Sequence, residues 1–118
     1  MTLYKAQVLF ERQIRNKRTW AIMATRLTNL VDRLGRETDV RDVYVADVRR
    51  YAQLRKKHIV PKGRNKGKLV SQETVSKELQ AGRALYNFLI RYAVVPETCN
   101  PFKEYIIGKV PFLEILKF

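Results

Sequence analysis

The sequence predicts an all-α fold, a small bundle of four to five helices joined by short connections. Three observations predict it. Apolar residues recur at helical spacing in four separate segments. Residues that favour the ends of helices stand at the borders of these segments. Alternating apolar and polar residues, the pattern of a half-buried strand, never extend beyond a few positions.

The first two predicted helices span residues 3–15 and 17–34. The first places four apolar residues roughly on one face: Leu3, Ala6, Phe10 and Ile14. The second has the cleanest helical stripe, which consists of Trp20, Ala24, Leu27, Val31 and Leu34. Asn16 and Thr19 are candidate N-caps for it. Gly35 follows the stripe where a residue that tolerates positive φ commonly ends a helix.

A connector and a third helix follow, over residues 36–44 and 45–57. Two valines of the connector are expected to reach the core, Val40 and Val43. The third helix is expected to turn Val48, Tyr51 and Leu54 inward. Residues 58–70 contain one proline, two glycines and four basic residues, which is a loop by composition.

The longest predicted helix spans residues 72–95, with Ser71 as its N-cap and Glu73 near its positive end. Its two apolar stripes are Val75, Leu79, Gly82, Tyr86, Leu89 and Ala93, and Ala81, Leu85, Phe88 and Tyr92. Two adjacent stripes predict a wide buried arc, so this helix is expected at the centre of the bundle. Glycine is unfavourable inside a helix, and Gly82 therefore predicts a close approach of another helix.

The charge of the chain is strongly unbalanced. Its 118 residues include 24 Lys and Arg against 11 Asp and Glu, which gives a net charge of +13. So much positive charge in a small domain favours a polyanionic partner, nucleic acid before an acidic membrane surface. The alternative is a soluble protein that is simply basic.

The sequence offers no recognisable catalytic group, and we expect no cofactor and no metal. Cys99 is the single cysteine, so it has no disulfide partner in this sequence and no zinc cluster around it. His58 is the single histidine, expected in solvent or near a phosphate. Gly67-Lys68 lacks the Ser or Thr of a phosphate-binding loop. Without an apolar run of about 20 residues or a signal-peptide pattern, we expect a cytoplasmic, nucleoid-associated protein and no membrane.

The basic residues suggest contacts with a nucleic-acid backbone. Residues 49–68 contain nine Lys or Arg and no acid, and they lead into the helix that starts after Ser71. Backbone N–H groups at a helix start bind phosphate well. The predicted contacts are Arg64, Lys66, Lys68, Ser71 and Thr74. A block of like charge that is only solvated remains the alternative.

Two further sets of residues are candidate DNA contacts. The exposed arc of the last helix carries long donors suited to base edges in the major groove: Lys77, Gln80, Arg83, Asn87 and Arg91. The start of the second helix is a second candidate phosphate clamp, formed by Lys17, Arg18 and Thr19 with Arg26 further along. We expect the helix starts near residues 17 and 71 to point the same way, so that one duplex lies across both. An ordinary soluble surface is the alternative.

The order of these features resembles the N-terminal core-binding domain of tyrosine recombinases, the phage-integrase family, over residues 15–102. The likeness begins with Lys17-Arg18-Thr19, which open a long helix that ends in residues 30–35. Further matching positions are Asp47, Val48, Tyr51, Arg55, Ser71, Thr74, Leu79, Leu85, Phe88, Tyr92, Asn100 and Pro101. The chain departs from the family in its longer, more basic loop at 58–70. It also has Val94-Val95-Pro96 in place of a turn that contains glycine.

The resemblance implies a SAM-like core-binding domain over 1–102 that binds double-stranded DNA at a recombination half-site. Such a domain is one jaw of a clamp, and the other jaw is a catalytic domain in cis. Residues 103–118 would be the interdomain linker or the start of that catalytic domain. This chain alone is then not an enzyme, and other recombinase protomers on the DNA are possible partners. The alternative is a non-catalytic basic helical adaptor or RNA-associated protein.

Overall fold

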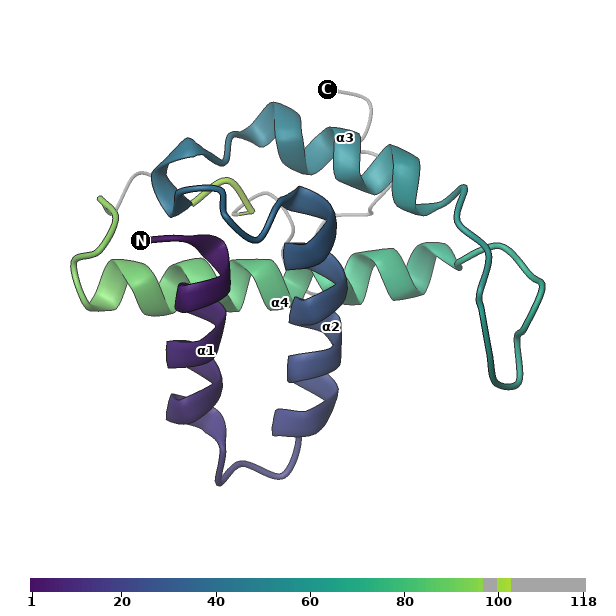
Figure 1. Ribbon diagram of the computed structural model, residues 1–118, viewed down its shortest axis with the longest axis horizontal. Helices are drawn as coiled ribbons and strands as arrows, with labels where there is room; N and C mark the ends of the chain where they lie inside the picture. Colours follow the sequence, from purple (N-terminus) through teal and green to yellow (C-terminus); the bar gives the residue numbers. More distant parts are fainter. Residues whose placement is uncertain (97–99, 103–118) are drawn as a thin grey trace.

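The computed structural model describes residues 1–96 and 100–102. These residues contain four α-helices and the segments that connect them (Figure 1). The helices are α1 (Leu3–Ile14), α2 (Trp20–Leu34), α3 (Val45–Arg55) and α4 (Gln72–Arg91), with a 3₁₀ turn, η1 (Val40–Asp42), before α3. No strand is assigned in these residues. The predicted all-α class is confirmed, and the segment 103–118 lies outside the described residues.

Helix α4 is the centre of this bundle. α1 and α2 run side by side in opposite directions and α4 lies across both, while α3 lies on the side away from the α1–α2 turn (Figure 1). Each of the other three helices contacts α4. The wide buried arc predicted for this helix is confirmed by its buried residues, which are Val75, Glu78, Leu79, Ala81, Gly82, Leu85, Tyr86 and Leu89.

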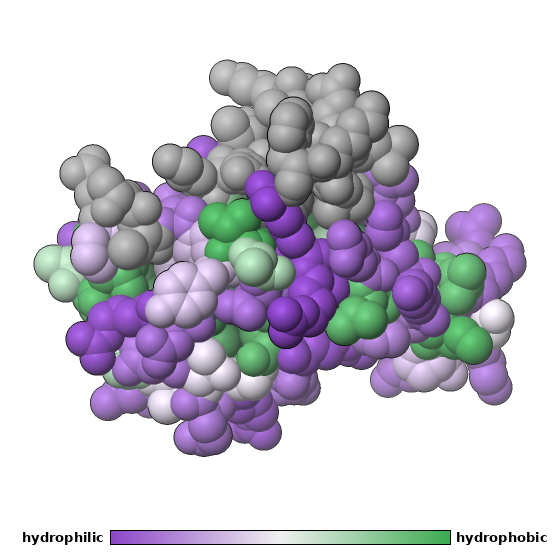
Figure 2. All heavy atoms as spheres, turned by 90° about the horizontal axis from the view of Figure 1, so that it is seen from above, coloured by the Kyte–Doolittle hydropathy of each residue, from purple (hydrophilic) through white to green (hydrophobic). Residues whose placement is uncertain are grey.

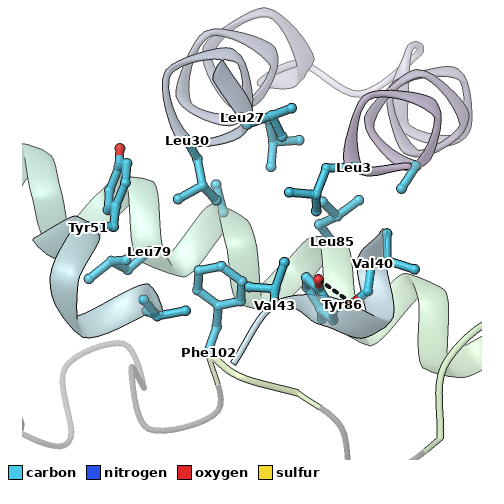
Figure 3. Close-up of a cluster of buried hydrophobic side chains, with 14 of the residues drawn as sticks. Leu3, Leu27, Leu30, Val40, Val43, Tyr51, Leu79, Leu85, Tyr86 and Phe102 are labelled. Carbon is cyan, nitrogen blue, oxygen red and sulfur yellow. Dashed lines mark hydrogen bonds between the residues drawn. The ribbon is translucent and has the colours of Figure 1, made fainter. Parts of the chain in front are cut away.

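The core fills the space between α4 and the elements that cross it (Figure 3). Tyr86 of α4 donates a hydrogen bond of 2.7 Å to the carbonyl oxygen of Val40, so its buried hydroxyl is satisfied. A Cβ atom added to Gly82 would lie 2.6 Å from Phe102 Cε1 and 2.8 Å from Leu30 Cδ2. The predicted close approach of another helix is confirmed for α2, through Leu30, but Phe102, which belongs to no helix, comes closer still.

Several local predictions are confirmed at the helix borders. Val40 and Val43 of the connector are buried. The hydroxyl of Ser71 caps α4 by accepting a hydrogen bond of 3.1 Å from the Thr74 N–H. Gly35 ends α2 at φ +111°, and its N–H donates to the carbonyl of Val31 at 2.9 Å.

Two predicted helix limits were wrong because single turns replace the α-helical pattern there. α2 begins at Trp20 and not at Lys17, since Lys17 N–H bonds to Ile14 at 2.8 Å and Trp20 N–H bonds back to Lys17 at 3.2 Å. α3 ends at Arg55 and not at residue 57, since Lys57 N–H bonds to Leu54 at 3.0 Å.

The end of α4 was also predicted too late, at residue 95 instead of Arg91. Ala93 takes a left-handed conformation with φ +57°, and its N–H bonds to Ile90 at 3.0 Å. The N–H of Val94 bonds to Leu89 at 2.9 Å. This pair of bonds is a Schellman motif, in which the left-handed position is usually glycine. An alanine therefore ends the helix where the sequence suggested continuation.

Four residues expected in apolar stripes are exposed: Trp20, Leu54, Tyr92 and Ala93. Trp20 and Tyr92 stand at the ends of their helices, beyond the packed part of each stripe. Leu54 is 51% exposed because α3 turns a different face inward, with Arg55 buried in its place.

Candidate nucleic-acid interface

The α1–α2 turn and the solvent side of α4 meet at one depression of about 410 Å³. Its polar lining comes from Gln13 at the end of α1, from Lys17 and Thr19 on the turn, and from Asn87 and Arg91 on α4. Residues more than sixty positions apart in the sequence are thus brought together. Lys17, Thr19, Asn87 and Arg91 are all among the candidate DNA contacts.

Packing beneath the depression fixes the distance between turn and helix. The rings of Phe10 on α1 and Phe88 on α4 have centroids 5.3 Å apart. Gln7 of α1 donates a hydrogen bond of 2.9 Å to the Thr28 hydroxyl of α2. The turn therefore joins two helices that pack against each other and against α4, which places its basic residues beside α4.

The N-terminus of α2 carries positive charge and no side-chain cap. Thr19 occupies the N-cap position, but its hydroxyl caps no backbone N–H, and the first turn of the helix contains no acid. Lys17 and Arg18 are exposed immediately before it. Arg26, the remaining residue predicted here, is half-buried further along α2. This arrangement favours an anion near residues 17–19.

The solvent side of α4 has the predicted residues but fewer free donors than expected. Lys77 and Asn87 are exposed, and Gln80 and Arg83 are half-buried. Lys77 forms an ion pair of 3.0 Å with Glu73. Asn100 spans part of this face, since its Nδ2 donates to Asn87 Oδ1 at 3.0 Å and to the Arg83 carbonyl at 3.4 Å.

The N-terminus of α4 is closed by its own side chains. Besides capping the Thr74 N–H, the Ser71 hydroxyl donates to Thr74 Oγ1 at 2.9 Å. Both hydroxyls predicted to contact phosphate are thus already bonded to each other. Arg64, Lys66 and Lys68 precede this helix and are fully on the surface.

The two helix entrances do not point in one direction, which corrects our expectation. α2 and α4 cross, so their N-termini leave the bundle along different directions (Figure 1). The α1–α2 turn and the tip of the hairpin-shaped segment 58–70 nevertheless project on the same side of α4 (Figure 1). Two separate basic elements therefore border one side of the molecule.

One charged cluster escaped the sequence analysis because it is buried. Arg55 and Glu78 form a two-pronged ion pair, Nε to Oε1 at 3.0 Å and Nη2 to Oε2 at 3.1 Å. The Tyr51 hydroxyl donates a hydrogen bond to the same carboxylate. Burial and this hydrogen bond raise the pKa of Tyr51 well above its usual range. Arg55, counted in the basic block 49–68, thus faces the core and not a ligand.

His58 lies beside this cluster and not in open solvent. Its Nδ1 is 3.3 Å from Arg33 Nε and 3.3 Å from Arg55 Nη1. Burial and the two arginine charges lower the pKa of His58. The ring therefore accepts hydrogen bonds from cations, which makes it a poor partner for a phosphate.

Comparison with protein-family models, with curated proteins and with solved structures finds no match for this chain. Among residues 1–96 and 100–102, no helix is long and apolar enough to cross a membrane. The same residues contain no group of three His, Cys, Asp or Glu side chains placed to hold a metal ion. The resemblance to tyrosine recombinases stays a prediction from the order of sequence features.

Proposed function

We propose that this chain binds double-stranded DNA at a recombination half-site, as the non-catalytic core-binding domain of a tyrosine recombinase. One observation carries the proposal: Lys17, Thr19, Asn87 and Arg91 line a single depression on a chain of net charge +13. Nucleic acid is the abundant polyanion that combines closely spaced phosphates with polar base edges.

The two sides of the depression have different roles in this proposal. The uncapped start of α2, with Lys17 and Arg18, contacts phosphates and sets the register of the protein on the duplex. The solvent side of α4 faces the major groove, which is wide enough for a helix. Gln80, Arg83 and Asn87 are the side chains on this face that suit base edges.

Binding is tested by fluorescence anisotropy with labelled DNA duplexes over a series of salt concentrations. Affinity is expected to fall steeply as salt rises, because phosphate contacts release counterions. Lys17→Ala is expected to weaken all duplexes alike and to lower the salt slope by about one. Lys5→Ala is the matched control, since Lys5 is exposed on α1 at the end opposite the turn.

Sequence discrimination separates the role of α4 from that of the turn. A duplex selected from a randomised pool is compared with a scrambled duplex. Asn87→Ala is expected to reduce the ratio of the two affinities, whereas Lys17→Ala leaves this ratio unchanged. Equal effects of the two variants on both duplexes overturn the assignment of α4 to the major groove.

Competition with other nucleic acids distinguishes DNA binding from the two alternatives, a basic helical adaptor and an RNA-associated protein. Absence of measurable affinity for any duplex at low salt overturns the DNA proposal and leaves a basic helical adaptor. Stronger binding to structured RNA than to duplex DNA favours an RNA-associated protein. The recombinase part is tested separately on the coding DNA beyond the codon for Phe118, where a catalytic domain with a late His-x-x-Arg and a C-terminal tyrosine is expected.

A further inference from the structure

The segment 58–70 is a slender hairpin that extends away from the helices (Figure 1). Ile59 and Leu69 form an antiparallel bridge. Val70 N–H donates to the His58 carbonyl at 2.9 Å, and Val60 N–H donates to Lys68 at 2.9 Å. We call residues 58–70 the arm. Its backbone pairing gives it a defined shape, in contrast to the plain loop that composition predicted.

The base of the arm is anchored in the bundle. Val70 is buried at 6% exposure, and Val60 packs against the core from the other strand. His58, at the start of the arm, contacts Arg33 of α2 and Arg55 of α3. The arm therefore leaves the molecule at a fixed place, directly before α4.

The end of the arm is narrow and strongly basic. Gly63 and Gly67 have φ of +90° and +83°, and a Cβ atom added at either would meet nothing within 4 Å. Every residue from 61 to 69 is exposed. The basic side chains are Lys62, Arg64, Lys66 and Lys68, and none of them forms an ion pair with a described residue.

The arm also exposes an apolar pair that the bundle does not cover. Ile59 is 62% exposed and Leu69 is 64% exposed, directly opposite each other across the two strands. Figure 2 shows hydrophobic atoms among hydrophilic ones at this end of the molecule. The arm thus combines a narrow basic tip with an apolar pair closer to its base. This combination suits a nucleic-acid groove that has an electronegative floor and walls formed by sugar rings.

We propose that the arm enters the minor groove of duplex DNA, with Arg64 on the groove floor and Ile59 and Leu69 against deoxyribose rings. The inference rests on the proposed DNA binding and adds a second, independent contact to it. The minor groove is only about 6 Å wide, so it admits a tip flanked by glycines more readily than a helix. A narrow A·T-rich minor groove has an enhanced negative potential that attracts arginine.

Base chemistry gives the expected preference. In the minor groove A·T pairs present only acceptors, whereas guanine adds the N2 amino group, a donor that repels the guanidinium of Arg64. Inosine lacks this amino group. An I·C pair therefore resembles A·T in the minor groove and G·C in the major groove. Duplexes that contain I·C pairs distinguish the two grooves without any change in the protein.

The test uses the whole chain and three duplexes that differ in one central segment of A·T, I·C or G·C pairs. The A·T and I·C duplexes are expected to bind equally and about tenfold more tightly than the G·C duplex. Arg64→Ala is expected to abolish this difference, so that the three duplexes bind with equal affinity, because α2 and α4 still bind but no guanidinium reads the minor groove. Lys5→Ala is the control and is expected to leave this difference unchanged.

Failure of this inference differs from failure of the proposed function. If no duplex binds at low salt, the proposed function is overturned together with the arm. If all duplexes bind but I·C behaves like G·C, the arm does not use the minor groove, while DNA binding stands. Discrimination that persists in Arg64→Ala overturns the role of this residue. A far-ultraviolet circular dichroism spectrum that matches wild type shows that the variant is folded.

Discussion

The buried Arg55–Glu78 pair allows a quantitative test of how this fold tolerates charge in its core. Glu78 is 1% exposed and Arg55 is 9% exposed, so solvent cannot replace a lost partner. Replacing Glu78 with leucine leaves the guanidinium of Arg55 and the hydroxyl of Tyr51 without their acceptor. Breaking a buried pair in this way costs about 3–5 kcal/mol. A domain of this size is stabilised by only about 5–15 kcal/mol, so the variant is expected to lose a large part of its stability.

Removing the whole cluster gives the opposite expectation. In a triple variant, Arg55→Leu, Glu78→Leu and Tyr51→Phe, no polar group remains unpaired. Apolar replacement of a complete buried pair is often neutral or stabilising, so we expect a free energy of unfolding within about 1 kcal/mol of wild type. Most of the loss in Glu78→Leu would then be the cost of an orphaned charge and not the net contribution of the pair.

Urea denaturation followed by circular dichroism measures both variants. Glu78→Leu is expected to shift the midpoint strongly at unchanged m-value. Glu73→Leu is the control on the same helix, because Glu73 pairs with Lys77 at the surface, where such pairs contribute about 0.3–0.5 kcal/mol. A loss below about 1 kcal/mol in Glu78→Leu, or an equal loss in the triple variant, refutes the reasoning.

Three further predictions concern single positions. Ala93→Gly is expected to stabilise the protein by about 1 kcal/mol, because left-handed backbone strains alanine but not glycine, and a lower melting temperature contradicts this. Gly82→Ala is expected to destabilise it by about 1–2 kcal/mol in urea denaturation, since a clash with the buried Phe102 ring outweighs the gain in helix propensity. Because the pKa of His58 is lowered in the folded state, stability is expected to fall as pH drops below about 6.5. His58→Gln should flatten that part of the stability–pH curve, and an unchanged slope assigns the effect to other groups.

Apolar periodicity predicted the helices well because each helix buries one face in the core, and this burial requires apolar residues at helical spacing. The stripe of α4 through Val75, Leu79 and Leu89 is fully buried as expected. The same method missed Arg55 and Glu78 because it counts only apolar residues as inward. A signal was nevertheless present: Glu78 lies three after Val75 and four before Gly82, inside the buried stripe, and Arg55 lies seven after Val48. If charged residues are also counted at the inward positions of a helix, the sequence indicates an acid on one helix and a base on another. Such residues are expected to form a buried ion pair.

Helix limits and the arm were less predictable because they depend on partners far along the chain. Nothing in the sequence around Lys17 indicates that this residue is not helical. It lies in a turn because the connection between the antiparallel helices α1 and α2 is short. The glycines and proline of 58–70 predicted a loop. Backbone pairing of Ile59 with Leu69 cannot be inferred from composition alone, because it needs a cross-strand register and a buried anchor such as Val70.

The candidate site was predicted residue by residue, but its organisation comes from the tertiary structure. Sequence analysis placed candidate phosphate contacts at both helix entrances, and the structure makes these entrances chemically different. At α4 the hydroxyl of Ser71 already satisfies a backbone N–H, and Glu73 adds a negative charge in the first turn. At α2 neither feature is present, and Lys17 stands beside Arg91 at the same depression. An incoming phosphate at α2 displaces no internal bond and meets no acid in the helix's first turn. In the proposed complex we therefore expect the phosphate contact at the α2 entrance, and the basic residues before α4 to act through the arm.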